Sequence, residues 1–216
     1  MPIRTVHEED ALAWLENGGV REGCSIITSM PDASEFPKFT REEWAAWFTN
    51  AAGLVLRATP ASGAAIFYQR DVKAEGAWVD KAYLIQKAAE AAGVRQLWHK
   101  IVARVPVGQP AYGKPGYSHL LCFSRGLHLE PGQSTSDILA DAGEVSWPRG
   151  MGRLVAETCC RFVAERTPTR TIVAPFCGEG VLLAVANAHG LDAVGIERSP
   201  KRAEKARAFR LDEVHA

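Results

Sequence analysis

The sequence has no net charge, because its 25 lysines and arginines are balanced by 25 aspartates and glutamates. A long, non-specific grip on nucleic acid is therefore not implied, since such binding neutralises many phosphates at once. The sequence also lacks internal repeats, low-complexity tracts and any apolar run long enough to span a membrane. Its N-terminus is charged, which argues against a signal peptide and favours the cytoplasm; the charged residues are Arg4, Glu8, Glu9 and Asp10.

Cysteine is scarce, and its five positions show no spacing typical of a metal site. Most of them fall inside expected strands or helices, which favours reduced, buried thiols and no bound metal. They are Cys24, Cys122, Cys159, Cys160 and Cys177. Cys177 lies in a glycine-containing turn, where a small residue packed beside a ligand is favoured over a nucleophile.

The most informative segment of the chain contains two glycines between two expected strands. Thr171 to Val173 is a β-branched run that predicts a buried strand, and Pro175 to Gly180 is a turn in which backbone can approach a ligand closely. A helix over Val181 to His189 should follow, and then a second strand over Asp192 to Ile196. The acid Glu197 ends that strand and can bind the hydroxyl groups of a ribose. This order of elements within 27 residues predicts a site for a nucleotide cofactor.

The same segment resembles the S-adenosylmethionine (SAM)-dependent methyltransferases, in particular those that methylate the exocyclic amines of adenine or cytosine in DNA or RNA. Their signature runs Asp-Pro-Phe-x-Gly-Ser-Gly and then Gly-Ile-Glu, and the chain matches it at Pro175, Phe176, Gly178, Gly180, Gly195, Ile196 and Glu197. The chain departs from it at Ala174, where the family has an acid that helps to hold the methionine end of the cofactor, and at Glu179, where the family often has serine. The resemblance implies SAM as the cofactor, with binding residues Asp10, Pro175, Phe176, Cys177, Gly178, Gly180 and Glu197.

A dinucleotide-dependent oxidoreductase is the competing interpretation of this segment. Its third glycine would fall at Leu183, and few residues remain after Glu197 to complete an ordinary Rossmann sheet. Only a helix from Pro200 to Leu211, with Ser199 as its N-cap, is expected there. The other strands must therefore precede the glycine turn.

Seven strands are expected, with helices between most of them. The strands are Ile3–Val6, Cys24–Thr28, Gly63–Tyr68, Gln96–Val105, Ser118–Ser124, Thr171–Val173 and Asp192–Ile196. Upstream helices are expected over Ala11–Leu15, over a segment opened by a Thr40–Glu43 capping box with Trp44, Phe48, Ala51 and Val55 on its apolar face, and over Trp78–Ala92 and Arg149–Glu165. A loop rather than a helix joins the strands over 96–105 and 118–124, so that pair should be antiparallel.

This order of elements matches a methyltransferase sheet that is circularly permuted, with the catalytic half before the cofactor half. We expect an α/β fold with a Rossmann-like, seven-stranded sheet in one domain, since one such unit uses nearly all 216 residues. The catalytic half covers 1–125, a connecting segment covers 126–148, and the SAM-binding half covers 149–216. Trp147-Pro148-Arg149 falls where the family contacts the methionine part of the cofactor.

The tetrapeptide Ser29-Met30-Pro31-Asp32 follows the second expected strand, at the edge where the sites of α/β proteins form. The family has Asp, Asn or Ser there, then Pro-Pro and an aromatic residue. The resemblance implies that Ser29 and the Pro31 carbonyl accept hydrogen bonds from the target amine. Met30 and Asp32 depart from the pattern. Asp32 is either a general base or only the cap of the turn before Phe36.

Further residues near the expected site have both a functional and an ordinary structural interpretation. Arg70 and Asp71 follow a strand and face the crevice edge, but a solvated loop explains them equally well. Tyr112 and Lys114 combine aromatic and basic character in a Pro/Gly-rich loop, as nucleic-acid contacts often do. Histidines inside strands are most often satisfied core residues, although His119 lies at a strand start and is placed to reach a site. We assign Met30, Arg70, Asp71, Tyr112, Lys114 and His119 as candidate substrate-binding residues.

The function expected from these features is N-methylation of a nucleobase in nucleic acid, with Ser29, Pro31 and Asp32 as catalytic residues. RNA is favoured over DNA, because DNA enzymes of the family usually carry a large recognition insert and the segment from Gly126 to Trp147 is short. Two alternatives stay open: a small-molecule or protein methyltransferase, and a non-catalytic SAM-fold subunit of a heteromeric enzyme. A homodimer or a partner subunit is compatible with the sequence, and no membrane contact is expected.

Overall fold

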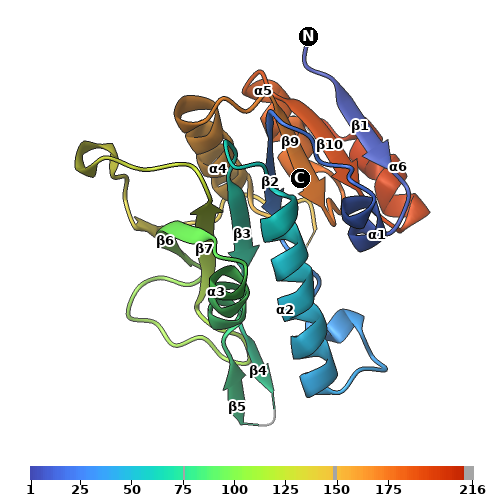
Figure 1. The fold of residues 1–216 in the computed structure, drawn as a ribbon. Coiled ribbons are helices and arrows are strands. Elements are labelled where there is room, and N and C mark those ends of the chain that lie inside the picture. Colours follow the sequence, from blue (N-terminus) through green and yellow to red (C-terminus); the bar gives the residue numbers. More distant parts are fainter. Residues whose placement is uncertain (75, 148–149, 212–216) are drawn as a thin grey trace.

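The computed structural model describes residues 1–74, 76–147 and 150–211. Its centre is an eight-stranded sheet, in which the strands lie in the order β1-β10-β9-β2-β3-β7-β6-β8 (Figure 1). The strands are β1 (Arg4–His7), β2 (Cys24–Thr28), β3 (Ala65–Gln69), β6 (Arg95–Ala103), β7 (Tyr117–Ser124), β8 (Ile138–Leu139), β9 (Thr171–Pro175) and β10 (Asp192–Ile196). Neighbouring strands from β1 to β3 are parallel, whereas β7 is antiparallel to both β3 and β6. The permuted order and the antiparallel pair are therefore confirmed.

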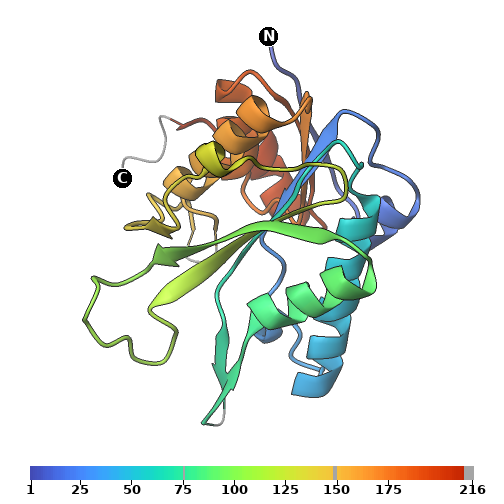
Figure 2. The ribbon, with the colours of Figure 1, turned by 60° about the vertical axis from the view of Figure 1, so that its left-hand side comes forward.

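Helices cover both faces of the sheet (Figures 1 and 2). One face is covered by α1 (Ala11–Glu16), α2 (Arg41–Ala58) and α3 (Lys81–Ala91), and the other by α4 (Arg153–Arg166), α5 (Val181–Ala188) and α6 (Pro200–Ala208). Successive strand residues point to opposite faces, so Ile26 packs under α2 whereas Ile27 packs toward the α4–α6 side. This arrangement buries both faces of the parallel strands, as their near-continuous apolar sequences require.

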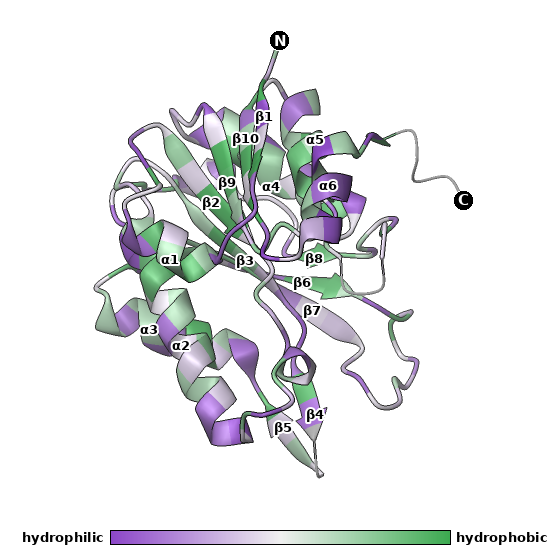
Figure 3. Cartoon of the chain, turned by 90° about the vertical axis from the view of Figure 1, so that its right-hand side faces the viewer, coloured by the Kyte–Doolittle hydropathy of each residue, from purple (hydrophilic) through white to green (hydrophobic). Residues whose placement is uncertain are grey.

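Hydropathy differs sharply among these elements. Figure 3 shows hydrophobic colour along β2, β9 and β10, whereas α6 at the surface is largely hydrophilic. Among the described helices, none combines the length and the apolar character that crossing a bilayer requires.

The sequence signals for α2 are confirmed in detail. The hydroxyl of Thr40 accepts a hydrogen bond from the Glu43 amide (3.1 Å), and the Glu43 carboxylate accepts one from the Thr40 amide (2.7 Å). This reciprocal capping box satisfies two amides that the first helical turn leaves free. The predicted apolar face of the helix is buried as expected at Trp44, Phe48, Ala51 and Val55.

The predicted helix over Trp78–Ala92 is wrong at its start. Residues on either side of Gly76 form a separate antiparallel hairpin of β4 (Val72–Ala74) and β5 (Ala77–Val79), and Trp78 belongs to β5. The Trp78 indole donates to Asp71 (2.9 Å), which holds the hairpin. Asp80 then caps α3 by accepting from the Tyr83 amide (2.9 Å). Each strand of the hairpin is only three residues long, which is too short to give a clear strand pattern.

Smaller corrections concern the edge of the sheet and two helix ends. β8 adds an eighth strand that pairs in parallel with β6, and two residues are too short a run to give a periodic signal. α4 begins at Arg153, and Pro148 and Arg149 lie outside the described residues. α6 ends at Ala208 rather than Leu211.

Candidate active site

One cavity of about 550 Å³ opens where the carboxyl ends of β2, β3, β9 and β10 meet. The glycine turn and the tetrapeptide both line it, although they lie far apart in the sequence. Of the predicted site residues, those that line it are Asp10, Ser29, Met30, Pro31, Asp32, Arg70, Asp71, Lys114, Pro175, Phe176, Cys177, Gly178, Gly180 and Glu197. Tyr112 and His119 are not part of its lining, and Tyr112 is 89% exposed.

The glycine turn has an unusual backbone. Phe176, Gly178 and Gly180 all have positive φ angles, of 61°, 57° and 91°. Glycine adopts this conformation readily, whereas it strains Phe176, and such strain is concentrated at ligand sites. A Cβ atom on Gly180 would lie 2.7 Å from the Cα of Ala206 in α6, so no larger residue fits there. The turn is therefore held in one shape by close backbone packing.

Glu197 is fixed at the end of β10 by two backbone hydrogen bonds. Its carboxylate accepts from the amides of Gly178 (3.2 Å) and Ser199 (2.9 Å), and its side chain is 7% exposed. The guanidinium of Arg202 lies 4.0 Å away. An ionised carboxylate has about four acceptor positions, so acceptor capacity remains for hydroxyl groups of a ligand in the cavity.

Trp147 covers the turn from the connecting segment. A Cβ atom on Gly178 would lie 3.3 Å from the indole nitrogen of Trp147, and the Arg202 guanidinium stacks over the same ring at 4.6 Å from its centroid. The sequence placed Trp147 at the methionine end of the cofactor, and the structure places it on the cavity wall beside the turn.

Ala174 and Cys177, beside and in the glycine turn, supply neither a charge nor a reactive thiolate to the cavity. Ala174 is 1% exposed, with its methyl group in the core beneath α4 and α5, so it supplies no charge where the resembling family has an acid. Burial, followed by the charge of Glu197, raises the pKa of the Cys177 thiol to about 12. The thiol therefore stays protonated at neutral pH and is unsuited to act as a nucleophile. The described cysteines are all free thiols.

Asp10 borders the cavity from the start of α1. Its carboxylate accepts hydrogen bonds from the amides of Leu12 (2.9 Å) and Ala13 (3.0 Å), which is ordinary N-cap geometry. The cap orients this carboxylate beside the cavity, so the structural role and a ligand contact are compatible.

The tetrapeptide lies opposite the glycine turn in the same cavity. Met30 is 3% exposed and packs into the core on the α1–α3 side. Asp32 precedes a short 3₁₀ turn over Ala33–Glu35, and its amide donates to the Glu35 carboxylate (3.2 Å). Its own carboxylate forms an ion pair with Lys81 (Oδ2 to Nζ, 3.4 Å).

Lys81 is a buried cation that the sequence analysis missed. Its side chain is 2% exposed, and its ammonium lies 5.4 Å and 5.7 Å from the ring centroids of Trp44 and Phe48. Burial lowers the pKa of Lys81, and the carboxylate of Asp32 opposes that shift. A sequence signal existed, because a lysine as the first residue of a helix opposes the helix dipole and suggests another reason for its presence.

Asp71 connects three elements beside the tetrapeptide. Its carboxylate accepts from the Lys81 amide (2.8 Å) and the Trp78 indole (2.9 Å), and it is bonded to His119 (2.9 Å), which in turn contacts His99 (2.9 Å). Burial raises the pKa of Asp71, but the hydrogen bonds from His119 and Trp78 outweigh that effect and hold the pKa below its ordinary value. These contacts fix the start of α3 and hence Lys81.

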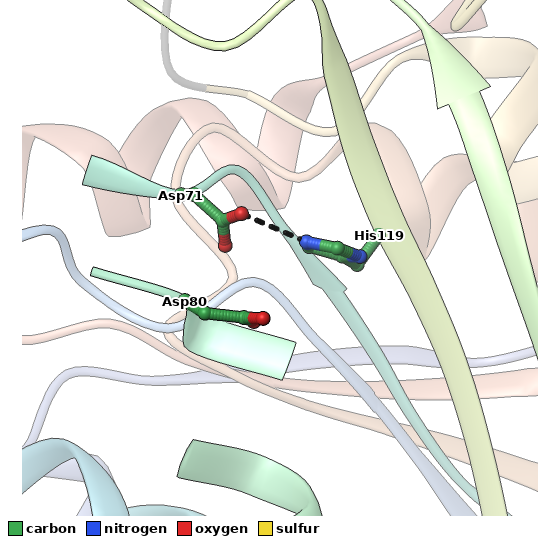
Figure 4. A group of neighbouring side chains, drawn as sticks. All are labelled: Asp71, Asp80 and His119. Atoms are coloured by element: carbon green, nitrogen blue, oxygen red, sulfur yellow. Dashed lines mark hydrogen bonds and ion pairs between the residues drawn. The ribbon is translucent and has the colours of Figure 1, made fainter. Parts of the chain in front are cut away.

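Asp71 and His119 also stand close to Asp80 (Figure 4). One potential metal-ligand atom from each residue lies within 4.8 Å of the others. The His119 nitrogen is already bonded to Asp71, and an Asp80 oxygen caps α3. Metal coordination would break the Asp71–His119 bond, so these contacts favour a structural hub.

Basic side chains line the cavity on the side away from the glycine turn. Arg70 donates from Nε to the Pro115 carbonyl (2.8 Å), which ties the 106–116 loop to the end of β3. Arg104 donates to the Tyr68 hydroxyl (3.0 Å). Burial, and then the nearby charge of Arg104, lower the pKa of Arg70. Lys114 and the acid Asp71 also line the cavity, so both signs of charge are present there.

No protein-family model matches the chain, and no curated protein matches it. Several solved structures do. TTHA0409 from Thermus thermophilus, described as a putative DNA modification methylase complexed with S-adenosyl-L-methionine, superposes with a TM-score of 0.74 at 20% identity over 99% of this chain and 97% of that one. PvuII DNA methyltransferase, described as cytosine-N4-specific, gives 0.75 at 16% identity over 98% and 87%. The M1.HpyAVI–SAM complex gives 0.63 at 12% identity over 95% and 99%. The chain therefore has the fold of these methyltransferases, as its sequence predicted.

Proposed function

We propose that the protein is a SAM-dependent methyltransferase that methylates an exocyclic amine of a base in nucleic acid. The observation that carries this proposal is the shared cavity that joins the glycine turn to the tetrapeptide at the carboxyl ends of neighbouring parallel strands. Ligands of open α/β sheets bind at this edge. Two structures with the same fold are described as SAM complexes, which supports the choice of cofactor.

The cofactor would occupy the end of the cavity formed by the glycine turn. Glu197 would accept hydrogen bonds from the ribose hydroxyls, and Asp10 would contact the adenine amine. Gly178 and Gly180 would let the turn keep its positive φ angles beside the cofactor. Because position 174 carries only a methyl group, the methionine end would rely on other groups near Trp147.

The cofactor, when bound, would supply a methyl group on a sulfonium, and the protein would hold the acceptor amine in line with it. The amine nitrogen would form the new bond to carbon, and the electrons of the carbon–sulfur bond would stay on sulfur. Ser29 and the Pro31 carbonyl would orient the amine by accepting its hydrogens. Asp32 would take the proton that the methylated nitrogen must lose. These residues line the same cavity.

A nucleic-acid acceptor suits the basic side chains of Arg70, Arg104 and Lys114, which line the cavity. The zero net charge suggests that only a few phosphates are contacted. The preference for RNA rested on the short 126–147 segment, and it gains no support from the structural neighbours. TTHA0409, of which this chain covers 97%, has nearly the same length and is described as a DNA modification methylase. DNA is therefore the first acceptor to test, and RNA the second.

Transfer of a labelled methyl group tests the proposal. Purified protein and labelled SAM are incubated with unmethylated genomic DNA, small RNA or a protein extract. We expect label in a nucleic-acid pool, and mass spectrometry of the digested product identifies the methylated base. Label only in protein would support the alternative acceptor class. No label in any pool, with a stable heterodimer in pull-down, would support the non-catalytic subunit suggested by Ala174.

Cofactor binding is measured separately by calorimetry. SAM and S-adenosylhomocysteine should bind, whereas NAD should not. Tight NAD binding would favour the competing oxidoreductase interpretation.

A further inference from the structure

Gln69 is a buried polar residue whose side-chain nitrogen has no hydrogen-bond partner among the described residues. It ends β3, is 2% exposed and lines the cavity. Its amide nitrogen is one of four buried side-chain nitrogen or oxygen atoms without a hydrogen-bond partner among the described residues. Buried amide donors are nearly always paired, because an unpaired one loses its hydrogen bonds to water without replacement. A donor left free on a cavity wall therefore points to a ligand.

The position of Gln69 in the sheet places it beside the tetrapeptide. β2 and β3 are parallel, and Thr28 pairs with Phe67. Ser29, the first residue of the tetrapeptide, follows Thr28 directly, and Gln69 lies two residues after Phe67. Phe67 points toward the α1–α3 side, so the alternation along β3 directs Gln69 to the same side.

Lys81 provides a second buried donor on that side. Its ammonium packs over Trp44 and Phe48 of α2 and lines the cavity, where it is paired with Asp32. The tetrapeptide itself offers acceptors, namely the Ser29 hydroxyl, the Pro31 carbonyl and the Asp32 carboxylate. Donors and acceptors thus line the same cavity. This arrangement complements a heterocycle edge on which an amine neighbours a ring nitrogen that carries a lone pair, as in cytosine and adenine.

We propose that Gln69 determines acceptor specificity by donating a hydrogen bond to the ring nitrogen beside the methylated amine. This role rests on the proposed function, which supplies the amine acceptor. Gln69 aligns the base, while Ser29, Pro31 and Asp32 act on the amine itself. A base that lacks the ring nitrogen would leave the Gln69 donor unpaired in the complex and would be rejected.

Replacing Gln69 should change the choice of substrate without lowering the stability of the fold. Its nitrogen has no hydrogen-bond partner among the described protein groups, so Gln69→Met keeps the side-chain length without breaking a hydrogen bond within the fold. We expect the variant to unfold at the same temperature as the wild type or higher. A glutamine with a structural role would instead lower the unfolding temperature when replaced.

The test compares two oligonucleotides: one with the base that the enzyme methylates, and one with its deaza analogue, in which a C–H group replaces the ring nitrogen beside the amine. The wild type should prefer the natural base by about 10- to 100-fold in kcat/KM, the range for one buried hydrogen bond. Gln69→Met should lose most of that preference. Gln86→Met is the matched control, because the Gln86 amide donates to Gln96 (3.2 Å) and lies outside the cavity lining. It should keep the wild-type preference.

The outcomes distinguish the two levels of the proposal. A wild type that labels no nucleic acid contradicts the proposed function. A wild type that methylates the natural base while Gln69→Met keeps the full preference contradicts the role of Gln69 and leaves the proposed function in place. A large drop in the unfolding temperature of Gln69→Met also contradicts it, since it would show that the side chain is needed for the fold.

Discussion

The two ends of the cavity differ in how their polar groups are satisfied before any ligand binds. At the cofactor end, Glu197 already accepts two backbone hydrogen bonds, and Gly180 fits tightly against α6. At the acceptor end, around the tetrapeptide, the side-chain nitrogen of Gln69 has no hydrogen-bond partner in the part of the chain that the structure describes. Lys81 is a buried cation there, with Asp32 as its ion-pair partner. The cofactor end is held in shape by hydrogen bonds and close packing within the protein, whereas the acceptor end contains an unpaired donor, the Gln69 side-chain nitrogen. Substitutions at the two ends should therefore separate cofactor affinity from acceptor chemistry.

The largest effect is expected from Asp32→Asn at the acceptor end. Asparagine keeps the size of the side chain but removes the charge that pairs with Lys81 and cannot take the proton, so turnover should fall by about 100-fold or more. SAM affinity measured by calorimetry should stay unchanged. Ser29→Ala should weaken acceptor positioning without altering the pH dependence of turnover. If Asp32→Asn remains active with the wild-type pH profile, the base role is wrong and amine alignment by Ser29 and Pro31 carries the mechanism.

Glu197→Ala tests the cofactor end. Loss of a charge-assisted hydrogen bond to the ribose should cost about 1 to 3 kcal/mol of SAM affinity, measured by calorimetry. At saturating SAM, transfer should be reduced less than it is by Asp32→Asn. Glu204→Ala on the exposed face of α6 is a control that removes the same charge. Unchanged SAM affinity in Glu197→Ala would mean that the carboxylate serves only to hold the turn.

The smallest effect should be that of Lys81→Met on stability. The folded pKa of Lys81 lies below its ordinary value of 10.5, so the unfolded chain binds more protons at pH values between the two. The free energy of unfolding of the wild type should therefore rise with pH across that window. Below it, Lys81 is charged in the folded state, and its burial destabilises the fold. Lys81→Met should match or exceed the wild type at neutral pH, and its advantage should shrink toward pH 10.5. Urea unfolding at several pH values measures this; a constant difference would show that Lys81 does not titrate there.

The sequence predicted the elements around the glycine turn better than the contacts around the tetrapeptide, and the reason is locality. Strand, turn, helix and acid follow one another from Thr171 to Glu197, so their pattern could be read along the chain. The pairing of Asp32 with Lys81 joins the end of β2 to the start of α3, and no local pattern encodes it. Gln69 is the last residue of a strand that is otherwise apolar. Only the packed structure shows that its side-chain nitrogen is buried without a hydrogen-bond partner among the residues described. The hairpin before α3 was not predicted because its strands are only three residues long.

The position of β9 and β10 between β1 and β2 has a consequence for folding. β1 lies at the sheet edge, and its pairing partner, β10, comes from the far end of the described chain, with Arg4 opposite Ala193. Arg4 also bonds to Asn187 (3.1 Å) and to the Phe209 carbonyl (2.6 Å). During synthesis β1 has no neighbouring strand until β10 has been made, and contacts between such distant segments form slowly. We therefore expect the cavity to form late in folding, when β9 and β10 insert between β1 and β2.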